Sequence, residues 1–208
     1  MALNATDWAY PTTVTGTGWT NVSGSLATDV KLDDNTNMAF HANPVRATNP
    51  LICSVWETAP ATALAIPPGA TPVGLEVALQ GYGNGASLPG TPLQIGVAFS
   101  KDAVTMIGDT KTIDVLEYTI GNPQPVQYLG SSSELWGAGW TDVEAEGNAL
   151  FLFYQQGATT GRYVDYVAMR IWYTDGSVIG PSTMGGSTSR CFPGLNCSHK
   201  LDPQSGRQ

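Results

Sequence analysis

The chain has 208 residues, a formal net charge of −8 and a charged fraction of 12%, about half of the roughly 25% found in ordinary soluble domains. Its 24 Gly, 14 Pro and 42% hydrophobic residues favour one large domain of short strands and turns over a helical one. The acidic balance argues against nucleic acid as the main partner, because phosphate contacts need clustered Lys and Arg. No apolar run approaches the roughly 18 residues of a membrane span, and residues 1–4 lack the features of a secretory signal.

Alternating apolar and polar residues predict strands along the first 175 residues. The clearest alternation is at 73–79 and 93–99, where every second residue is apolar. The continuous apolar run at 149–154 predicts a central strand that is covered on both faces or lies at an interface, and 142–148 permits one helical turn. The expected strands are 11–19, 37–40, 51–56, 73–79, 93–99, 112–118, 126–129, 149–154 and 164–173.

Short strands at this spacing, joined by Gly- and Pro-rich turns, predict an all-β, antiparallel β-sandwich of jelly-roll-like architecture. Cys53 falls in an apolar run, so we expect it to be a small core residue. After residue 175 the chain is dominated by Gly, Ser and Pro and the alternation stops. We therefore predict a sandwich domain at 1–175 with a short N-terminal arm, and an extended, non-globular C-terminal tail at 176–208.

The tail differs from the body in charge. Residues 1–175 hold 6 Lys and Arg against 16 Asp and Glu, a net of −10, whereas residues 176–208 hold 3 against 1, a net of +2. Such a tail cannot offset roughly 1–2 kcal/mol of backbone entropy per ordered residue by itself, so we expect another subunit to order it. The alternative is a solvated tail with incidental cations. The candidate assembly contacts are Arg190, Phe192, Leu195, Lys200 and Arg207.

Cys191 and Cys197 bracket a Pro-Gly turn that can bring their sulfur atoms together, and they form a candidate disulfide. A reducing cytosol opposes this bridge unless it forms after release from the cell, so both states stay open. A metal site made of these two thiols and His199 is the weaker alternative, because the sequence offers no second pair of ligands.

The sequence contains no recognisable active site, and we expect no catalytic residues, no cofactor and no metal. His41 and His199 have no Gly-x-Ser-x-Gly motif near them. A glycosidase-type pair of Asp142 with Glu144 or Glu146 is an alternative. A second alternative is calcium bound by oxygen ligands of one loop, although the regular loop spacing is missing. Its candidate ligands are Asp29, Asp33, Asp34 and Asn35.

Three phrases occur in a fixed order between residues 64 and 173. The first is Ile66-Pro67-Pro68-Gly69-Ala70, the second is Leu135-Trp136-Gly137 with Trp140-Thr141, and the third is Val164-Asp165-Tyr166-Val167 running to Trp172-Tyr173. Over about residues 60–174 the chain resembles a domain common in structural proteins of tailed bacteriophages. Physical roles are also expected for them: Pro67 and Gly69 fix a turn, Gly137 and Gly139 allow close packing of the Trp rings, and Asp165 caps a turn or meets Arg162 or Arg170.

The resemblance implies a virion component with no catalytic residues. Within that class we expect a capsid decoration (cement) protein that binds and stabilises the head shell and is assembled in the host cytoplasm. Its expected partners are the major capsid protein or other virion subunits, and copies of itself in a dimer or trimer. A tail, neck or fibre component is the first alternative. A carbohydrate-binding jelly-roll module is the second, with Tyr82 in a Gly-rich loop as its stacking platform.

Overall fold

The computed structural model describes residues 2–21, 25–31, 38–42, 49–59, 61–83, 93–117, 124–154 and 161–175. The chain divides into two units, Met1–Gly176 and Ser177–Gln208, and every described residue lies in the first. Outside the described residues lie the predicted tail, both cysteines of the candidate disulfide and all five candidate assembly contacts. The same holds for residues 33–35 of the proposed calcium loop.

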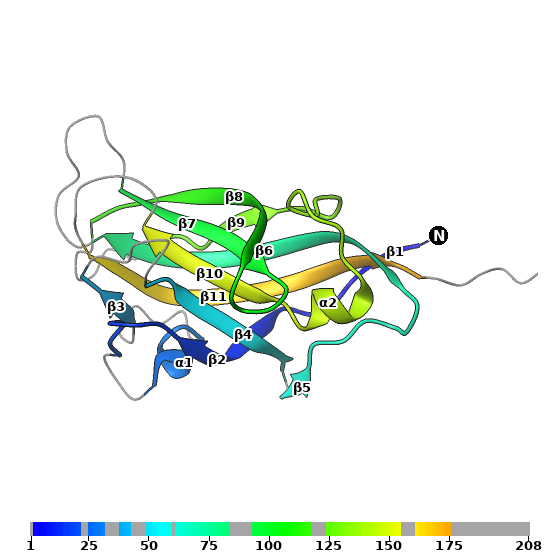
Figure 1. Cartoon of the computed structure of the whole chain (residues 1–208), viewed down its shortest axis with the longest axis horizontal. Helices are drawn as coiled ribbons and strands as arrows, with labels where there is room; N and C mark the ends of the chain where they lie inside the picture. Colours follow the sequence, from blue (N-terminus) through cyan, green and yellow to red (C-terminus); the bar gives the residue numbers. More distant parts are fainter. Residues whose placement is uncertain are drawn as a thin grey trace, which may run out of the picture. The chain divides into compact units, whose positions relative to one another are not determined.

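The described part of the chain forms eleven strands and two short helices (Figure 1). In chain order they are β1 (Leu3–Ala5), β2 (Ala9–Thr15), α1 (Leu26–Asp29), β3 (Ala39–His41), β4 (Leu51–Thr58), β5 (Thr62–Ala63), β6 (Thr71–Gly83), β7 (Leu93–Ser100), β8 (Met106–Val115), β9 (Gln127–Gly130), α2 (Asp142–Glu146), β10 (Ala149–Tyr154) and β11 (Arg162–Thr174). The helical turn predicted near residue 142 is therefore present as α2.

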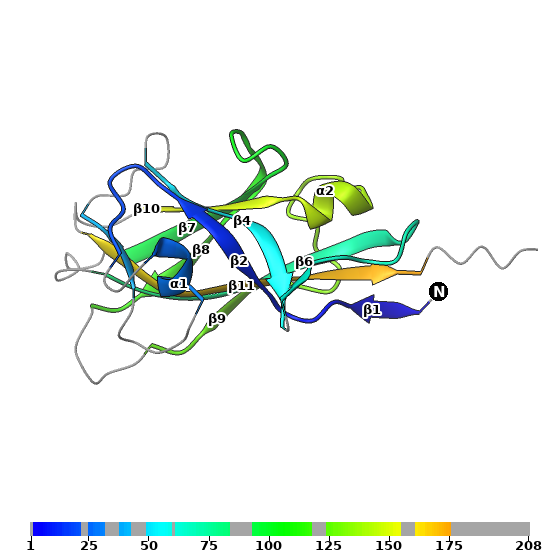
Figure 2. The ribbon, with the colours of Figure 1, turned by 90° about the horizontal axis from the view of Figure 1, so that it is seen from below.

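The named strands pair in antiparallel fashion in the order β8-β7-β10-β4-β2-β11-β6-β9, with β1 and β3 on β11 and β5 on β4. Strands β2 and β11 share only the pair Ala9 and Met169, and the sheet folds over at this narrow junction. The first layer is β8-β7-β10-β4-β2, and the second layer is β11-β6-β9 with β1. Figure 2 shows β4 and β10 on one side and β6, β11 and β1 on the other. The predicted antiparallel β-sandwich is confirmed.

The core fills the space between the layers because alternate residues of each strand point inward. The two strands with the clearest alternation, β6 and β7, bury the residues predicted for one face, with Val73 only partly covered. Cys53 is fully buried, as predicted, and burial raises the pKa of its thiol. The fully or almost fully buried inward residues of these strands and of β11 are Leu75, Val77, Leu79, Leu93, Ile95, Val97, Phe99, Val167, Met169 and Ile171.

Strand β10 lies between β7 and β4 and is buried on both faces. Leu150 and Leu152 belong to the main core, whereas Phe151 and Phe153 face the other side and pack with Ala98 in a second, smaller cluster. This explains the continuous apolar run and confirms the prediction of a central, doubly covered strand.

Most strand boundaries differ from the sequence-based prediction by a few residues, and β1 and β5 were not predicted. Strand β2 ends at Thr15 because Gly16-Thr17-Gly18 forms a turn, with Gly18 at φ +78°. Strand β8 begins at Met106 instead of residue 112, because a short connection returns the chain beside β7 and pairs Met106 with Ser100. The Asp102 carboxylate shapes this connection, since its Oδ1 accepts hydrogen bonds from the backbone N–H groups of Val104 (2.9 Å) and Thr105 (2.7 Å).

Candidate functional site

The second phrase, Leu135-Trp136-Gly137 with Trp140-Thr141, is bonded to β6. This strand begins directly after the first phrase, which ends at Ala70. Trp136 is fully buried, and its indole Nε1 donates a 2.9 Å hydrogen bond to the backbone oxygen of Leu75. The N–H of Leu75 donates in turn to the backbone oxygen of Glu134 at 2.9 Å. The ring of Trp136 meets Phe99 edge-to-face at 4.8 Å. The second phrase therefore packs against the first half of β6, the strand that follows the Ile-Pro-Pro-Gly turn.

The backbone at Trp136 lies unusually close to β8. Trp136 has φ +54° and accepts a 2.8 Å hydrogen bond from the N–H of Asp109. A Cβ atom on Gly108, itself at φ +63°, would lie 1.9 Å from the backbone oxygen of Trp136. Only glycine fits there. Gly108 was not among the glycines predicted to allow close packing of the Trp rings. Of the two that were, Gly137 (φ +67°) would place a Cβ 2.9 Å from the Asp109 carboxylate, and the prediction for Gly139 is wrong, since a Cβ there would meet nothing within 4 Å.

The first phrase is held by carboxylates of α2. The Glu146 side chain accepts a 2.7 Å hydrogen bond from the N–H of Ile66, and Asp142 accepts one from the N–H of Gly69 at 3.4 Å. Glu144 closes a capping box with Thr141 and pairs with Lys101 at 2.8 Å. The Lys101 ammonium, and next the N–H of Thr141, lower the pKa of Glu144. A glycosidase acid needs a raised pKa, and these three carboxylates instead bond backbone groups and a lysine.

The third phrase contributes buried strand residues. Val164 and Val167 lie in the core, and the N–H of Val167 donates to the backbone oxygen of Val30 at 2.8 Å. Asp165 is fully buried, whereas Arg170 bonds Glu76, so the alternative in which Asp165 meets Arg170 is wrong. The register with β6 shifts between Val164 and Tyr166, so Asp165 lies at an irregularity of β11 where strict alternation does not hold. The contacts described for the three phrases are therefore structural: they hold the sandwich together.

Tyr82, the predicted sugar platform, is 1% exposed, and its hydroxyl accepts a hydrogen bond from the N–H of Gln124 at 3.1 Å. The prediction failed because β6 runs on through Gly83, so Tyr82 belongs to a strand and not to a loop. His41 is buried beside Trp19, with its Nε2 2.9 Å from Nδ2 of Asn49, and burial lowers its pKa.

The outer side of the second layer holds a group of aromatic and charged side chains that the sequence analysis missed. Their strand positions gave a signal: in β11 the residues Tyr166, Arg170 and Trp172 alternate with the core residues, and so must point outward. Together with side chains of β2, β6, β9 and the β1–β2 connection they form what we call the aromatic face. Its members are Trp8, Tyr10, Glu76, Tyr128, Tyr166, Arg170 and Trp172.

Arg170 organises this face. Its guanidinium carbon lies 4.6 Å from the ring centroid of Trp8 and 4.6 Å from that of Trp172. Oxygen Oε2 of Glu76 accepts hydrogen bonds from Nε of Arg170 at 2.8 Å and from Nε1 of Trp172 at 2.9 Å. The same oxygen lies 2.8 Å from Nη2 of Arg170 in an ion pair. The Trp8 ring also meets Tyr128, with 5.8 Å between centroids. The cation is thus stacked between two indoles and neutralised by one carboxylate.

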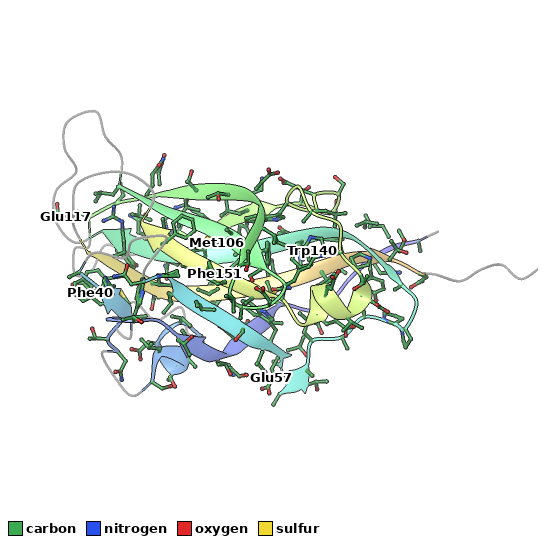
Figure 3. All side chains as sticks on the ribbon, in the orientation of Figure 1. Phe40, Glu57, Met106, Glu117, Trp140 and Phe151 are labelled. Atoms are coloured by element: carbon green, nitrogen blue, oxygen red, sulfur yellow. The ribbon has the colours of Figure 1, made fainter. Side chains whose placement is uncertain are left out.

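A second surface feature lies on the outer side of the first layer. It is an apolar hollow of about 560 Å³, lined by Pro50, Ile52, residues 103–106 and Phe151. Figure 3 shows Met106 and Phe151 together at this place. The hollow contains no charged side chain among its lining residues, so it offers contact area without a group that would orient a polar ligand.

Two findings bear on other site classes, both restricted to the described ranges. No group of three or more His, Cys, Asp or Glu side chains there is placed to hold a metal ion. No helix there reaches the length and apolar character needed to cross a membrane.

Comparison with known proteins found no matching family model and no matching curated protein. Among solved structures, the enzymatically active domain of tailspike protein 4 of bacteriophage CBA120 matches with a TM-score of 0.37 and 10% identity, over 79% of this chain and 19% of that protein. The xylan-binding CBM22-1 domain of Paenibacillus barcinonensis Xyn10C matches at 0.36 and 13%, over 74% and 85%. TmCBM61, solved with β-1,4-galactotriose, matches at 0.34 and 10%, over 78% and 86%. TM-scores of this size assign neither a fold family nor a function to this chain.

Proposed function

We propose that the chain is a structural protein of a tailed-phage virion, and in particular a decoration protein that binds and stabilises the capsid shell. The observation that supports this most directly is the role of the three phrases. Residues of all three phrases that resemble phage structural proteins take part in building the sandwich: Trp136 bonds β6, Glu146 holds Ile66, and Val167 lies in the core. The resemblance therefore concerns a sandwich framework.

The proposal includes no catalytic activity and no cofactor. The carboxylates that offered a glycosidase pair each bond a backbone N–H group: Asp142 with Gly69, Glu144 with Thr141 and Glu146 with Ile66. A side chain that holds a turn or a helix end is poorly placed to move a proton to a substrate. The proposed partners are the major capsid protein and further copies of the chain, and the proposed location is the virion.

The experiment is electron microscopy of particles assembled without this protein, together with their resistance to heat. Under the decoration proposal the shell loses surface density and bursts at a lower temperature, and purified protein restores both properties. Shells that are unchanged while tails or fibres are missing would favour the first alternative, a tail, neck or fibre component.

The role of the tail is tested on the same particles. Deleting residues 176–208 should weaken attachment while the sandwich stays folded. A finer variant replaces the three tail cations Arg190, Lys200 and Arg207 by Glu, and Lys31→Glu on the sandwich is the matched control. Substituting Cys191 and Cys197 by Ser tests whether a bridge pre-forms the anchor of Phe192 and Leu195. Unchanged attachment of the deletion variant would show that the tail takes no part in assembly.

A second candidate function is carbohydrate binding. The observation that favours it is the aromatic face, which combines half-exposed rings with a carboxylate and a guanidinium on one sheet surface. Sites for small polar ligands commonly pair aromatic walls with a few placed polar groups. The platform differs from the one expected from the sequence, since Tyr82 is buried and Tyr128 is exposed.

A further inference from the structure

We propose that the aromatic face is a binding site for a neutral glycan, with Tyr128 and Trp8 as the surface on which a sugar ring stacks. The Arg170–Glu76 pair beside them would hydrogen-bond the sugar hydroxyl groups. This assignment rests on the second candidate function and is independent of the virion role.

The sheet register places the stacking surface. Ala168 of β11 pairs with Ala78 of β6, and Ala78 pairs with Tyr128 of β9. Both alanines point away from the core, because their neighbours Met169 and Val77 are core residues. They are nevertheless 0% and 1% exposed, so larger side chains must cover them. Trp8 and Tyr128 come from the two sides of this row and meet with 5.8 Å between ring centroids.

The rings differ in how much surface they offer. Tyr128 is 61% exposed and is the most accessible ring of the face, whereas Trp8 and Trp172 are half-buried. Arg170 covers one side of each indole at 4.6 Å. A sugar would therefore stack on the open side of Tyr128 and contact the rim of Trp8, which is tilted by 48° to it.

The polar pair is fixed before any ligand arrives. Glu76 contacts Arg170 and Trp172 through a single oxygen, Oε2, and Arg170 meets this oxygen with Nε and Nη2. A carboxylate oxygen accepts more than one hydrogen bond and a guanidinium has five N–H donors. Side chains that are already ordered lose little entropy on binding, which favours affinity.

The chemistry of a sugar ring matches this layout. A pyranose presents C–H groups on its faces, which pack against aromatic rings, and hydroxyl groups at its rim, which donate and accept hydrogen bonds. Charge selects a neutral glycan over an anionic one. The guanidinium is already neutralised by Glu76, and residues 1–175 carry a net charge of −10, so an acidic polysaccharide or a nucleic acid would be repelled.

The test uses the full chain on an array of neutral and anionic glycans, followed by titration with dextran, glucomannan, arabinogalactan and, as the anionic probe, alginate. We expect binding to at least one neutral glycan and none to alginate. Tyr128→Ala should raise the dissociation constant at least about tenfold. Leu116→Ala, at a site with the same 61% exposure, is the matched control and should leave it unchanged. Thermal unfolding of each variant shows whether the fold is kept.

Each other outcome overturns the proposal in a different way. If a neutral glycan binds equally well to Tyr128→Ala and to Trp8→Ala, carbohydrate binding stands but its site lies elsewhere. If no glycan binds, or alginate binds best, both the site and the neutral-glycan function are wrong. If Tyr128→Ala loses attachment to phage particles and no glycan binds, the face belongs to a protein contact.

Discussion

Two neighbouring residues of β6, Leu75 and Glu76, each accept a hydrogen bond from the indole N–H of a tryptophan. Leu75 belongs to the core and Glu76 to the aromatic face, and these two regions use the tryptophan rings in opposite ways. At Leu75 the backbone oxygen receives Trp136, which is fully buried and packs on Phe99 in the core. At Glu76 the side chain receives Trp172, which is half-buried and shares the carboxylate with Arg170. A backbone acceptor cannot change without moving the strand, whereas a side-chain acceptor can be altered alone. The first region therefore determines the architecture, and the second can vary in its chemistry on an unchanged framework.

The largest effect should follow from removing the buried ring. Trp136→Ala leaves a cavity and an unpaired oxygen on Leu75, and should lower the free energy of unfolding by about 3–5 kcal/mol. Urea denaturation followed by circular dichroism measures the loss. Trp136→Phe keeps most of the volume and should cost less. On the aromatic face, Tyr128→Ala should change stability by no more than about 0.5 kcal/mol, because the ring is mostly exposed. Similar losses for Trp136→Ala and Tyr128→Ala would remove the contrast between the regions.

A smaller effect should come from the carboxylate of the aromatic face. Glu76→Gln removes the charged acceptor of Arg170 and Trp172, and the free energy of unfolding should fall by about 1–3 kcal/mol. The matched control is Glu134→Gln, which breaks the more exposed ion pair with Lys111 and should cost at most about 1 kcal/mol. Equal losses in the two variants, measured by the same denaturation, would mean that the stack around Arg170 adds nothing to an ordinary surface pair.

The helix that holds the first phrase gives the next effect. Thr141→Ala removes the N-cap of α2, in which the Thr141 hydroxyl accepts the N–H of Glu144 at 3.2 Å, and should cost about 1 kcal/mol. Thr141→Ser keeps the hydroxyl and should retain most of the stability. If Thr141→Ala is as stable as the parent protein, α2 is not needed to place Asp142 and Glu146 against residues 66–69.

The smallest effect concerns a turn that belongs to neither region. The backbone N–H groups of Thr105 and Val104, and then the Ser100 hydroxyl, lower the pKa of Asp102 from 3.8 to about 2. A pKa lowered by folding means that the stabilising effect is complete above pH about 3.8 and is lost as the pH falls towards 2. Carboxyl chemical shifts in an NMR titration measure this pKa directly. The stabilities of the parent protein and Asp102→Asn should converge across this window, and a midpoint near 3.8 would contradict the turn geometry.

The fold was predictable where the local sequence pattern of a strand, alternating or continuously apolar, is clear by itself. Alternation at 73–79 and 93–99 and the apolar run at 149–154 were each confirmed, because period two reports directly which side chains share a face. Tyr82 was placed wrongly because glycines on both sides suggested a loop, while pairing with β11 keeps Gly83 in the strand. Gly108 gave no sequence signal, since its need for glycine arises from the backbone of Trp136, which is distant in the chain.

By itself the sequence determined the antiparallel strands, the inward residues and the change of composition at residue 175, because these depend on local alternation and on turn residues. Only the tertiary structure decided which outward residues meet. Glu76 and Trp172 are 96 positions apart, and Trp8 reaches Arg170 through the fold of the sheet between β2 and β11. Such contacts depend on register and layer packing, which no local pattern encodes. The aromatic face therefore became visible only once the strands were paired.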